Sequence, residues 1–277
     1  MSKPLRHILE FHFKSMSALS DLFARAKAEN RAALIGYMPA GFPSRQGSID
    51  VINAMVAGGV DIVEVGYPYS DPVMDGPVIQ RATERALSSG FVAHDLFTVI
   101  SKISAPTLAM TYWNPIERYG VSAFTERLAQ VGGVGVITPD LTIEESDEWI
   151  AATSKQGIDR VYVVAPSTSD ERLQKVIGKC SGFVYAAILM GVTGARSAIA
   201  SSARELVERV RRVSALPICV GLGVSNAEQA RDVANFADGV IVGSAFISLV
   251  QSASNEKEAA EKVRVLAQEL AQAVTRA

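Results

Sequence analysis

Residues 32–65 of this 277-residue chain read AALIGYMPAGFPSRQGSIDVINAMVAGGVDIVEV and carry the clearest indication of its fold. The stretch opens with an apolar run at 32–37 and closes with another at 61–65, and both runs predict strands. Between them, Pro43-Ser44 begins a segment with apolar residues at helical spacing, which Gly58-Gly59 ends. Strand, helix and strand in this order are typical of a βαβ unit with parallel strands.

The same alternation continues along the chain. Further apolar runs predict strands at residues 107–112, 134–138, 160–164, 183–188, 217–220 and 239–242. Amphipathic segments predict helices at residues 19–27, 77–89, 121–131, 143–152, 170–179, 203–213, 227–235 and 256–274. We interpret Trp113-Asn114-Pro115 as a turn after the third strand.

Eight strands with helical crossovers predict an α/β protein, a single (β/α)8 TIM barrel with extra N-terminal and C-terminal helices. Residues 16–277 are expected to form this one catalytic domain, and residues 1–15 a disordered N-terminal extension. A doubly wound open sheet is the alternative architecture.

Composition excludes several classes of function. Lys and Arg total 27, and Asp and Glu total 29, so the chain lacks the excess of positive charge that is typical of nucleic-acid-binding proteins. Two cysteines and three histidines predict neither a disulfide framework nor a metal site. The longest apolar stretch, residues 239–250, is too short for a membrane span of roughly 20 residues, and the N-terminus lacks a signal-peptide core. We therefore expect a cytoplasmic protein without membrane or nucleic-acid partners.

The end of the second predicted strand and the loop after it are rich in carboxylates. Glu64 shares one strand face with Ile62 and Gly66, so a barrel would direct it into the interior, where desolvation raises a carboxyl pKa. It is a candidate general acid–base, or alternatively a structural carboxylate bonded to a neighbouring strand. Asp75 either faces Glu64 or merely begins the next helix, and Asp71 suits a structural role.

Glycine-rich turns follow the last three predicted strands, at Gly191-Val192-Thr193-Gly194, Gly221-Leu222-Gly223 and Gly243-Ser244. Backbone N–H groups of such turns hold phosphate without lysine, and barrels of this kind use the loops after strands seven and eight. The sequence therefore favours a phosphorylated substrate.

Tyrosines lie at the ends of three predicted strands, namely Tyr37, Tyr112 and Tyr185. A single tyrosine in such a place usually packs in the core, but the three together suit a flat aromatic substrate.

The run at residues 64–80, with its Pro-Tyr-Ser-Asp-Pro-x-x-Asp-Gly-Pro-x-Ile-Gln pattern, resembles the tryptophan synthase α subunit family. The resemblance extends over most of the chain and includes residues 110–115, 191–196, 220–225 and 239–245. It implies a (β/α)8 barrel that cleaves indole-3-glycerol phosphate to indole and glyceraldehyde 3-phosphate. Such a carbon–carbon lyase needs no cofactor of its own.

The resemblance also assigns residues. It implies catalytic roles for Glu64 and Asp75. It implies contacts with the rest of the substrate for Tyr112, Tyr185 and Thr193, and contacts with its phosphate for Gly194, Gly223, Gly243 and Ser244. The chain departs from the family at residues 39–43, Pro-Ala-Gly-Phe-Pro in place of Thr-Ala-Gly-Asp-Pro, and at the apolar stretch 188–190.

The family further implies a partner. A tryptophan synthase β subunit carries pyridoxal phosphate and joins indole to serine, in an assembly of two α subunits with a β dimer. The alternatives are a stand-alone lyase that releases free indole, or a non-catalytic α-like activator, against which the presence of both Glu64 and Asp75 argues. A phosphosugar isomerase is less favoured, because the paired carboxylates come without a catalytic lysine or histidine.

Overall fold

The computed structural model describes residues 17–188 and 196–276, without the side chains of residues 196–199. The expected N-terminal extension and the site residues Thr193 and Gly194 therefore lie outside the described residues.

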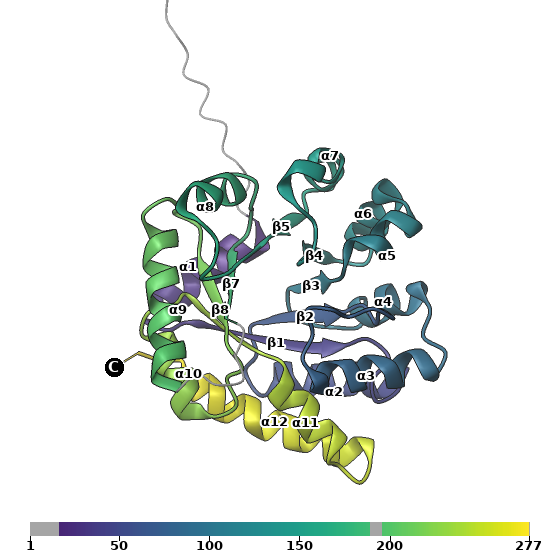
Figure 1. The fold of residues 1–277 in the computed structure, drawn as a ribbon. Helices are drawn as coiled ribbons and strands as arrows, with labels where there is room; N and C mark the ends of the chain where they lie inside the picture. The colour runs from purple at the N-terminus through teal and green to yellow at the C-terminus, as the bar shows by residue number, and fades with distance from the viewer. Residues whose placement is uncertain (1–16, 189–195, 277) are drawn as a thin grey trace, which may run out of the picture.

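Parallel strands form the centre of the molecule (Figure 1). They are β1 (Ala33–Pro39), β2 (Ile62–Gly66), β3 (Thr107–Met110), β4 (Gly133–Ile137), β5 (Asp159–Val161), β6 (Val163–Val164), β7 (Val184–Ala187), β8 (Ile218–Gly221) and β9 (Gly239–Val242). Their order is β5-β4-β3-β2-β1-β9-β8-β7-β6.

The two edge strands of this order are halves of one predicted strand, interrupted at Tyr162. On one side, β5 pairs with β4, and on the other, β6 pairs with β7. The backbone closes the gap, because the N–H of Tyr185 donates to the carbonyl oxygen of Tyr162 at 3.3 Å. The sheet is thus a barrel with eight strand positions, which confirms the predicted fold class and makes the open-sheet alternative wrong.

Helices cover the outside of the barrel. They are α1 (Ala18–Ala28), α2 (Arg45–Ala57), α3 (Pro77–Ser88), α4 (Ala93–Ile100), α5 (Trp113–Tyr119), α6 (Val121–Gln130), α7 (Asp147–Gln156), α8 (Asp170–Ile177), α9 (Arg196–Arg211), α10 (Ala227–Ala234), α11 (Ser244–Gln251) and α12 (Glu256–Ala273), with a short 3₁₀ helix η1 (Ile143–Glu145). The expected terminal helices are α1 and α12, and none of the described helices has the length and apolar character needed to cross a bilayer.

Inward side chains fill the barrel, and α1 closes its amino end. Phe23 of α1 meets Phe183 edge-on, with ring centroids 5.9 Å apart. Besides Phe183, which directly precedes β7, this interior cluster contains the strand residues Ala33, Ile35, Ile62, Leu108, Ile137, Val161, Cys219 and Ile241. This apolar cluster fills the amino-terminal part of the barrel, and in barrels of this kind the active site lies at the carboxyl ends of the strands.

The prediction of a turn at Trp113-Asn114-Pro115 is wrong, because α5 begins at Trp113. The carboxylate of Asp140 accepts the Trp113 backbone N–H at 2.9 and 3.1 Å, so a distant residue supplies the group that satisfies this helix start. Pro115 fits the first turn, where no N–H is needed. The eight-residue helices α4 and α11 were not predicted, and α9 begins before its expected start at residue 203.

Candidate active site

Glu64 lies on β2, level with Tyr37 of β1 and Leu108 of β3. Its side chain is 0% exposed, and neither carboxylate oxygen has a hydrogen-bond partner among the described residues. Desolvation raises the pKa of Glu64 from 4.5 to about 8. The described surroundings thus lack the hydrogen bond that a structural role would require, and Glu64 holds a proton at neutral pH.

Asp75 lies near the end of the loop between β2 and α3. The Tyr112 hydroxyl donates a hydrogen bond to Asp75 Oδ2 at 3.3 Å and accepts one from the Met74 backbone N–H at 2.9 Å. Burial raises the pKa of Asp75 from 3.8 to about 6, and the bond from Tyr112 opposes that rise. Asp75 is therefore mostly ionised at pH 7, where Glu64 is mostly protonated, so the two carboxyl groups suit opposite tasks.

Inward-facing glycines make room for two tyrosine rings at the barrel mouth. A Cβ atom on Gly221 would lie 2.6 Å from Tyr185 Oη, and one on Gly243 would lie 3.2 Å from Tyr37 Cδ1. A Cβ on Gly66 would collide with the Tyr37 hydroxyl. Gly243 is therefore small for a packing reason as well as for the backbone approach to phosphate that the sequence suggested.

The buried Tyr37 and the partly buried Tyr185 both interact electrostatically with the two carboxylates. Burial, followed by the negative charges of Asp75 and Glu64, raises the pKa of Tyr37 well above 10. Burial also raises the pKa of Tyr185, with smaller contributions that include the same two carboxylates. The predicted residues Glu64, Asp75 and Tyr185 therefore lie in one cluster, and both phenols remain neutral hydrogen-bond donors.

The predicted phosphate positions lie at the ends of β8 and β9. Gly223 has φ +72°, a conformation that favours glycine, and Gly243 precedes the first turn of α11. Among the described residues, no side chain caps α11, and the N–H groups at a helix start favour an anion. Ser225 and Ser244 line one cavity of about 620 Å³, which places the two loops side by side.

Two further residues were missed from the sequence. The ring of Tyr69 lies 5.3 Å from that of Tyr112, at an interplanar angle of 34°. Asp140, which follows β4 closely, positions the segment after Tyr112 through its bonds to Trp113. The barrel fold could have indicated both residues, because each lies in a loop that follows the carboxyl end of a strand. Asp71 is exposed and accepts a hydrogen bond from the Ser70 hydroxyl at 2.6 Å, as expected of a loop residue.

The described residues contain no group of three His, Cys, Asp or Glu side chains that could hold a metal ion. Within those same residues, the site offers carboxyl, phenol and backbone N–H groups at the end of a barrel.

The family model described as "Tryptophan synthase alpha chain" matches residues 23–275. The chain belongs to the tryptophan synthase alpha chain family. The alpha chain of Thermobifida fusca is 56% identical to it over 265 residues, which cover 94% of this chain and 98% of that one. The alpha chain of Streptomyces avermitilis is 54% identical over 260 residues, covering 92% and 94% of the two chains.

Solved structures agree with this membership. A crystal structure of tryptophan synthase from M. tuberculosis matches with a TM-score of 0.86 and 44% identity, covering 94% of this chain and 99% of that chain. A tryptophan synthase alpha-subunit structure from Pyrococcus furiosus matches with a TM-score of 0.79 and 32% identity, covering 87% and 98%. These findings confirm the predicted family and its enzyme class, a carbon–carbon lyase of tryptophan biosynthesis that acts on indole-3-glycerol phosphate.

Proposed function

We propose that Glu64 and Asp75 carry out the retro-aldol cleavage of indole-3-glycerol phosphate in this chain. The observation that supports this assignment is the pair of carboxyl groups at one barrel mouth, with pKa values raised to about 8 and about 6. A protonated and an ionised carboxyl are the two groups that the reaction needs at neutral pH.

Glu64 acts as the proton shuttle. Its carboxyl group donates a proton to C3 of the indole ring, which makes the ring a leaving group, and its carboxylate takes the proton of the glycerol hydroxyl beside the breaking bond. The carbon–carbon bond then breaks, the hydroxyl becomes the aldehyde of glyceraldehyde 3-phosphate, and indole leaves. Positive charge builds on the indole nitrogen meanwhile, and the Asp75 carboxylate stabilises it by accepting the N–H.

The remaining site residues orient the substrate. Tyr112 and Tyr185 form the wall beside the indole ring, where Tyr112 also fixes Asp75 through its hydroxyl. The phosphate binds the backbone N–H groups at Gly223, Gly243 and Ser244, together with Thr193 and Gly194. Binding energy from the phosphate end holds the reacting carbon against Glu64.

The partner in this proposal is a tryptophan synthase β subunit that carries pyridoxal phosphate, in an assembly of two α subunits with a β dimer. This chain itself contributes no cofactor. Val73 and Met74, 81% and 41% exposed, place apolar surface on the loop beside Asp75. Exposed apolar side chains at a barrel mouth suit a docking surface across which indole passes from one subunit to the other. A cytoplasmic location stays a prediction.

The test is indole release from indole-3-glycerol phosphate by the purified chain, with and without a β subunit, beside Glu64→Gln. We expect weak cleavage that the β subunit raises strongly and that the substitution abolishes. Rapid cleavage without a partner would favour a stand-alone lyase. Stimulation of the β subunit by Glu64→Gln and by the unchanged chain alike, with no cleavage by either, would favour a non-catalytic activator.

A further inference from the structure

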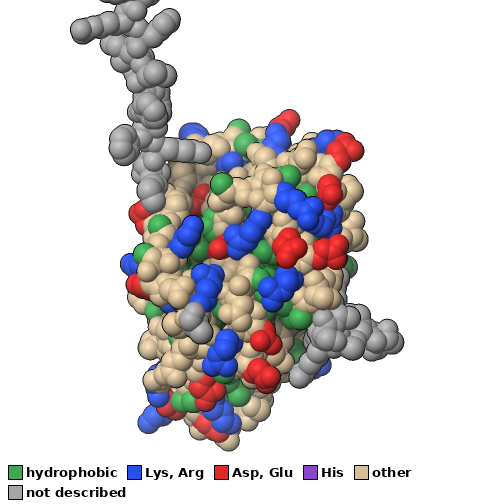
Figure 2. Space-filling model, turned by 90° about the vertical axis from the view of Figure 1, so that its left-hand side faces the viewer, with side chains coloured by type: hydrophobic (Ala, Val, Ile, Leu, Met, Phe, Trp, Pro, Cys, Tyr) green, Lys and Arg blue, Asp and Glu red, His purple; other side chains and the backbone are tan. Residues whose placement is uncertain are grey.

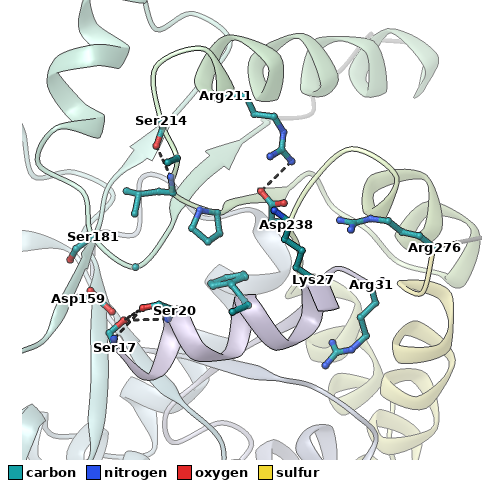
Figure 3. Close-up of a pocket in the computed structure, with 16 residues that line it drawn as sticks. Ser17, Ser20, Lys27, Arg31, Asp159, Ser181, Arg211, Ser214, Asp238 and Arg276 are labelled. Carbon is teal, nitrogen blue, oxygen red and sulfur yellow. Dashed lines mark hydrogen bonds and ion pairs between the residues drawn. The ribbon is translucent and has the colours of Figure 1, made fainter. Parts of the chain in front are cut away.

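The amino end of the barrel holds a cavity of about 610 Å³ beside α1 (Figure 3). The arginines that line it are bonded within the protein: Arg211 pairs with Asp238 at 3.1 Å, and Arg276 donates to two backbone carbonyl oxygens. Asp159 Oδ2 lacks a hydrogen-bond partner among the described residues, but it is enclosed and out of reach of a ligand. Figure 2 shows this side of the molecule, where Lys and Arg side chains are interspersed with Asp and Glu. These polar groups therefore do not identify a ligand.

A free hydrogen-bond donor lies at the carboxyl end of the barrel instead, on Tyr37. This buried residue of β1 is level with Glu64 of β2, and its hydroxyl has no hydrogen-bond partner among the described residues. The fully enclosed, unpartnered atoms of those residues include both Glu64 oxygens and the Tyr162 hydroxyl, but not the hydroxyl of Tyr37. Because a buried phenol normally has a partner, the arrangement indicates that a bound molecule supplies one.

The Tyr37 ring crosses the barrel mouth from β9 toward β2. Near the backbone of Tyr37, a Cβ atom on Gly243 would lie 3.2 Å from Cδ1 and 3.3 Å from Cβ of the tyrosine. At the far end of the ring, a Cβ on Gly66 would collide with the hydroxyl oxygen. Gly243 belongs to the proposed phosphate site, and Gly66 follows Glu64 by two residues on the same strand face. The ring therefore extends from the phosphate end of the site toward the reacting carboxyl groups.

The substrate of the proposed reaction extends in the same direction. In indole-3-glycerol phosphate, a glycerol chain joins the phosphate to C3 of the indole ring. The carbon next to the ring carries the hydroxyl whose proton Glu64 is proposed to take. With the phosphate at Gly243 and this hydroxyl at Glu64, the glycerol chain runs along the Tyr37 side chain. The phenol then lies at the end of the chain where the carbon–carbon bond breaks.

We propose that the Tyr37 phenol donates a hydrogen bond to the oxygen of this hydroxyl, an inference that rests on the proposed lyase function. The contact holds the oxygen in place while its proton leaves, and it stabilises the negative charge that the oxygen then gathers. Because burial raises the pKa of Tyr37 well above 10, the phenol keeps its proton and remains a donor. Tyr37 thereby distinguishes compounds that carry this hydroxyl from those that lack it.

Steady-state kinetics of Tyr37→Phe test the proposal with two compounds. Indole-3-glycerol phosphate is the substrate, and the deoxy analogue that lacks only this hydroxyl is an unreactive competitive inhibitor. We expect Tyr37→Phe to lower kcat/KM for cleavage about tenfold and to change the inhibition constant of the analogue by less than about twofold. Phenylalanine keeps the ring that packs beside Gly243, so the shape of the pocket is preserved. Equal weakening for both compounds, or an unchanged kcat/KM, would overturn the proposal.

Tyr119→Phe is the matched control, because it removes the same atom from an exposed tyrosine of α5. This variant should cleave the substrate as the unchanged chain does. A calorimetric titration separates the inference from the lyase proposal, because binding needs no cleavage. Failure of the lyase proposal would appear as absence of cleavage by the unchanged chain. Failure of this inference would appear when Tyr37→Phe, introduced into the Glu64→Gln chain, weakens binding of both compounds equally or of neither.

Discussion

The buried carboxyl of Glu64 predicts an unusual dependence of stability on pH. Its pKa is 4.5 when exposed and about 8 in the folded chain, so between these values the folded state keeps a proton that the unfolded state releases. Folding is therefore disfavoured as pH rises through this window. At about 1.4 kcal/mol per pH unit, the loss approaches about 5 kcal/mol above pH 8. Glu64→Gln replaces the carboxyl with a neutral group of similar shape and removes this loss.

The assay is urea unfolding of both chains at pH values between 5 and 9. We expect Glu64→Gln to match the unchanged chain near pH 5 and to exceed it by about 5 kcal/mol near pH 9. Other titrating groups are common to both chains, so their contributions cancel in the difference. Glu126→Gln, at an exposed position, is the control variant for the loss of a carboxyl group and is measured over the same pH range. A Glu64→Gln difference that stayed constant with pH would refute the buried, protonated carboxyl.

Three further predictions concern the site. The pH profile of kcat/KM for cleavage should be bell-shaped. The value should fall below about pH 6, where Asp75 gains a proton, and above about pH 8, where Glu64 loses one. A flat profile would contradict these roles. Tyr112→Phe removes the hydrogen-bond donor that lowers the pKa of Asp75. In steady-state kinetics, the acid side of the pH profile should therefore move to higher pH, and kcat should fall up to about tenfold. Gly221→Ala places a Cβ 2.6 Å from Tyr185 Oη and should cost about 1–3 kcal/mol in urea unfolding, with partial recovery when Tyr185→Phe removes that hydroxyl.

Local patterns predicted the strands because each is a short apolar run flanked by turn residues. The run at residues 160–164 was predicted as one strand, yet it pairs through β5 on one side and β6 on the other. The division into two strands arises only in the closed barrel, because this one segment pairs with β4 on one side and with β7 on the other. Helix α5 escaped prediction for a related reason, because the carboxylate that caps Trp113 comes from Asp140, 27 residues further along the chain.

The family and the identity of the candidate carboxyl groups follow from local sequence, because the motif from Glu64 to Asp75 is continuous in the chain. The sequence also placed Glu64 on the inner face of a strand, since side chains alternate along strands. The protonation states, in contrast, depend on how distant segments pack around the two carboxyl groups. The pKa of a carboxyl depends on the water and the partners that surrounding segments remove or supply, and these come from strands and loops far apart in the chain. That is why Glu64 lacks any described hydrogen-bond partner while Asp75 receives one from Tyr112.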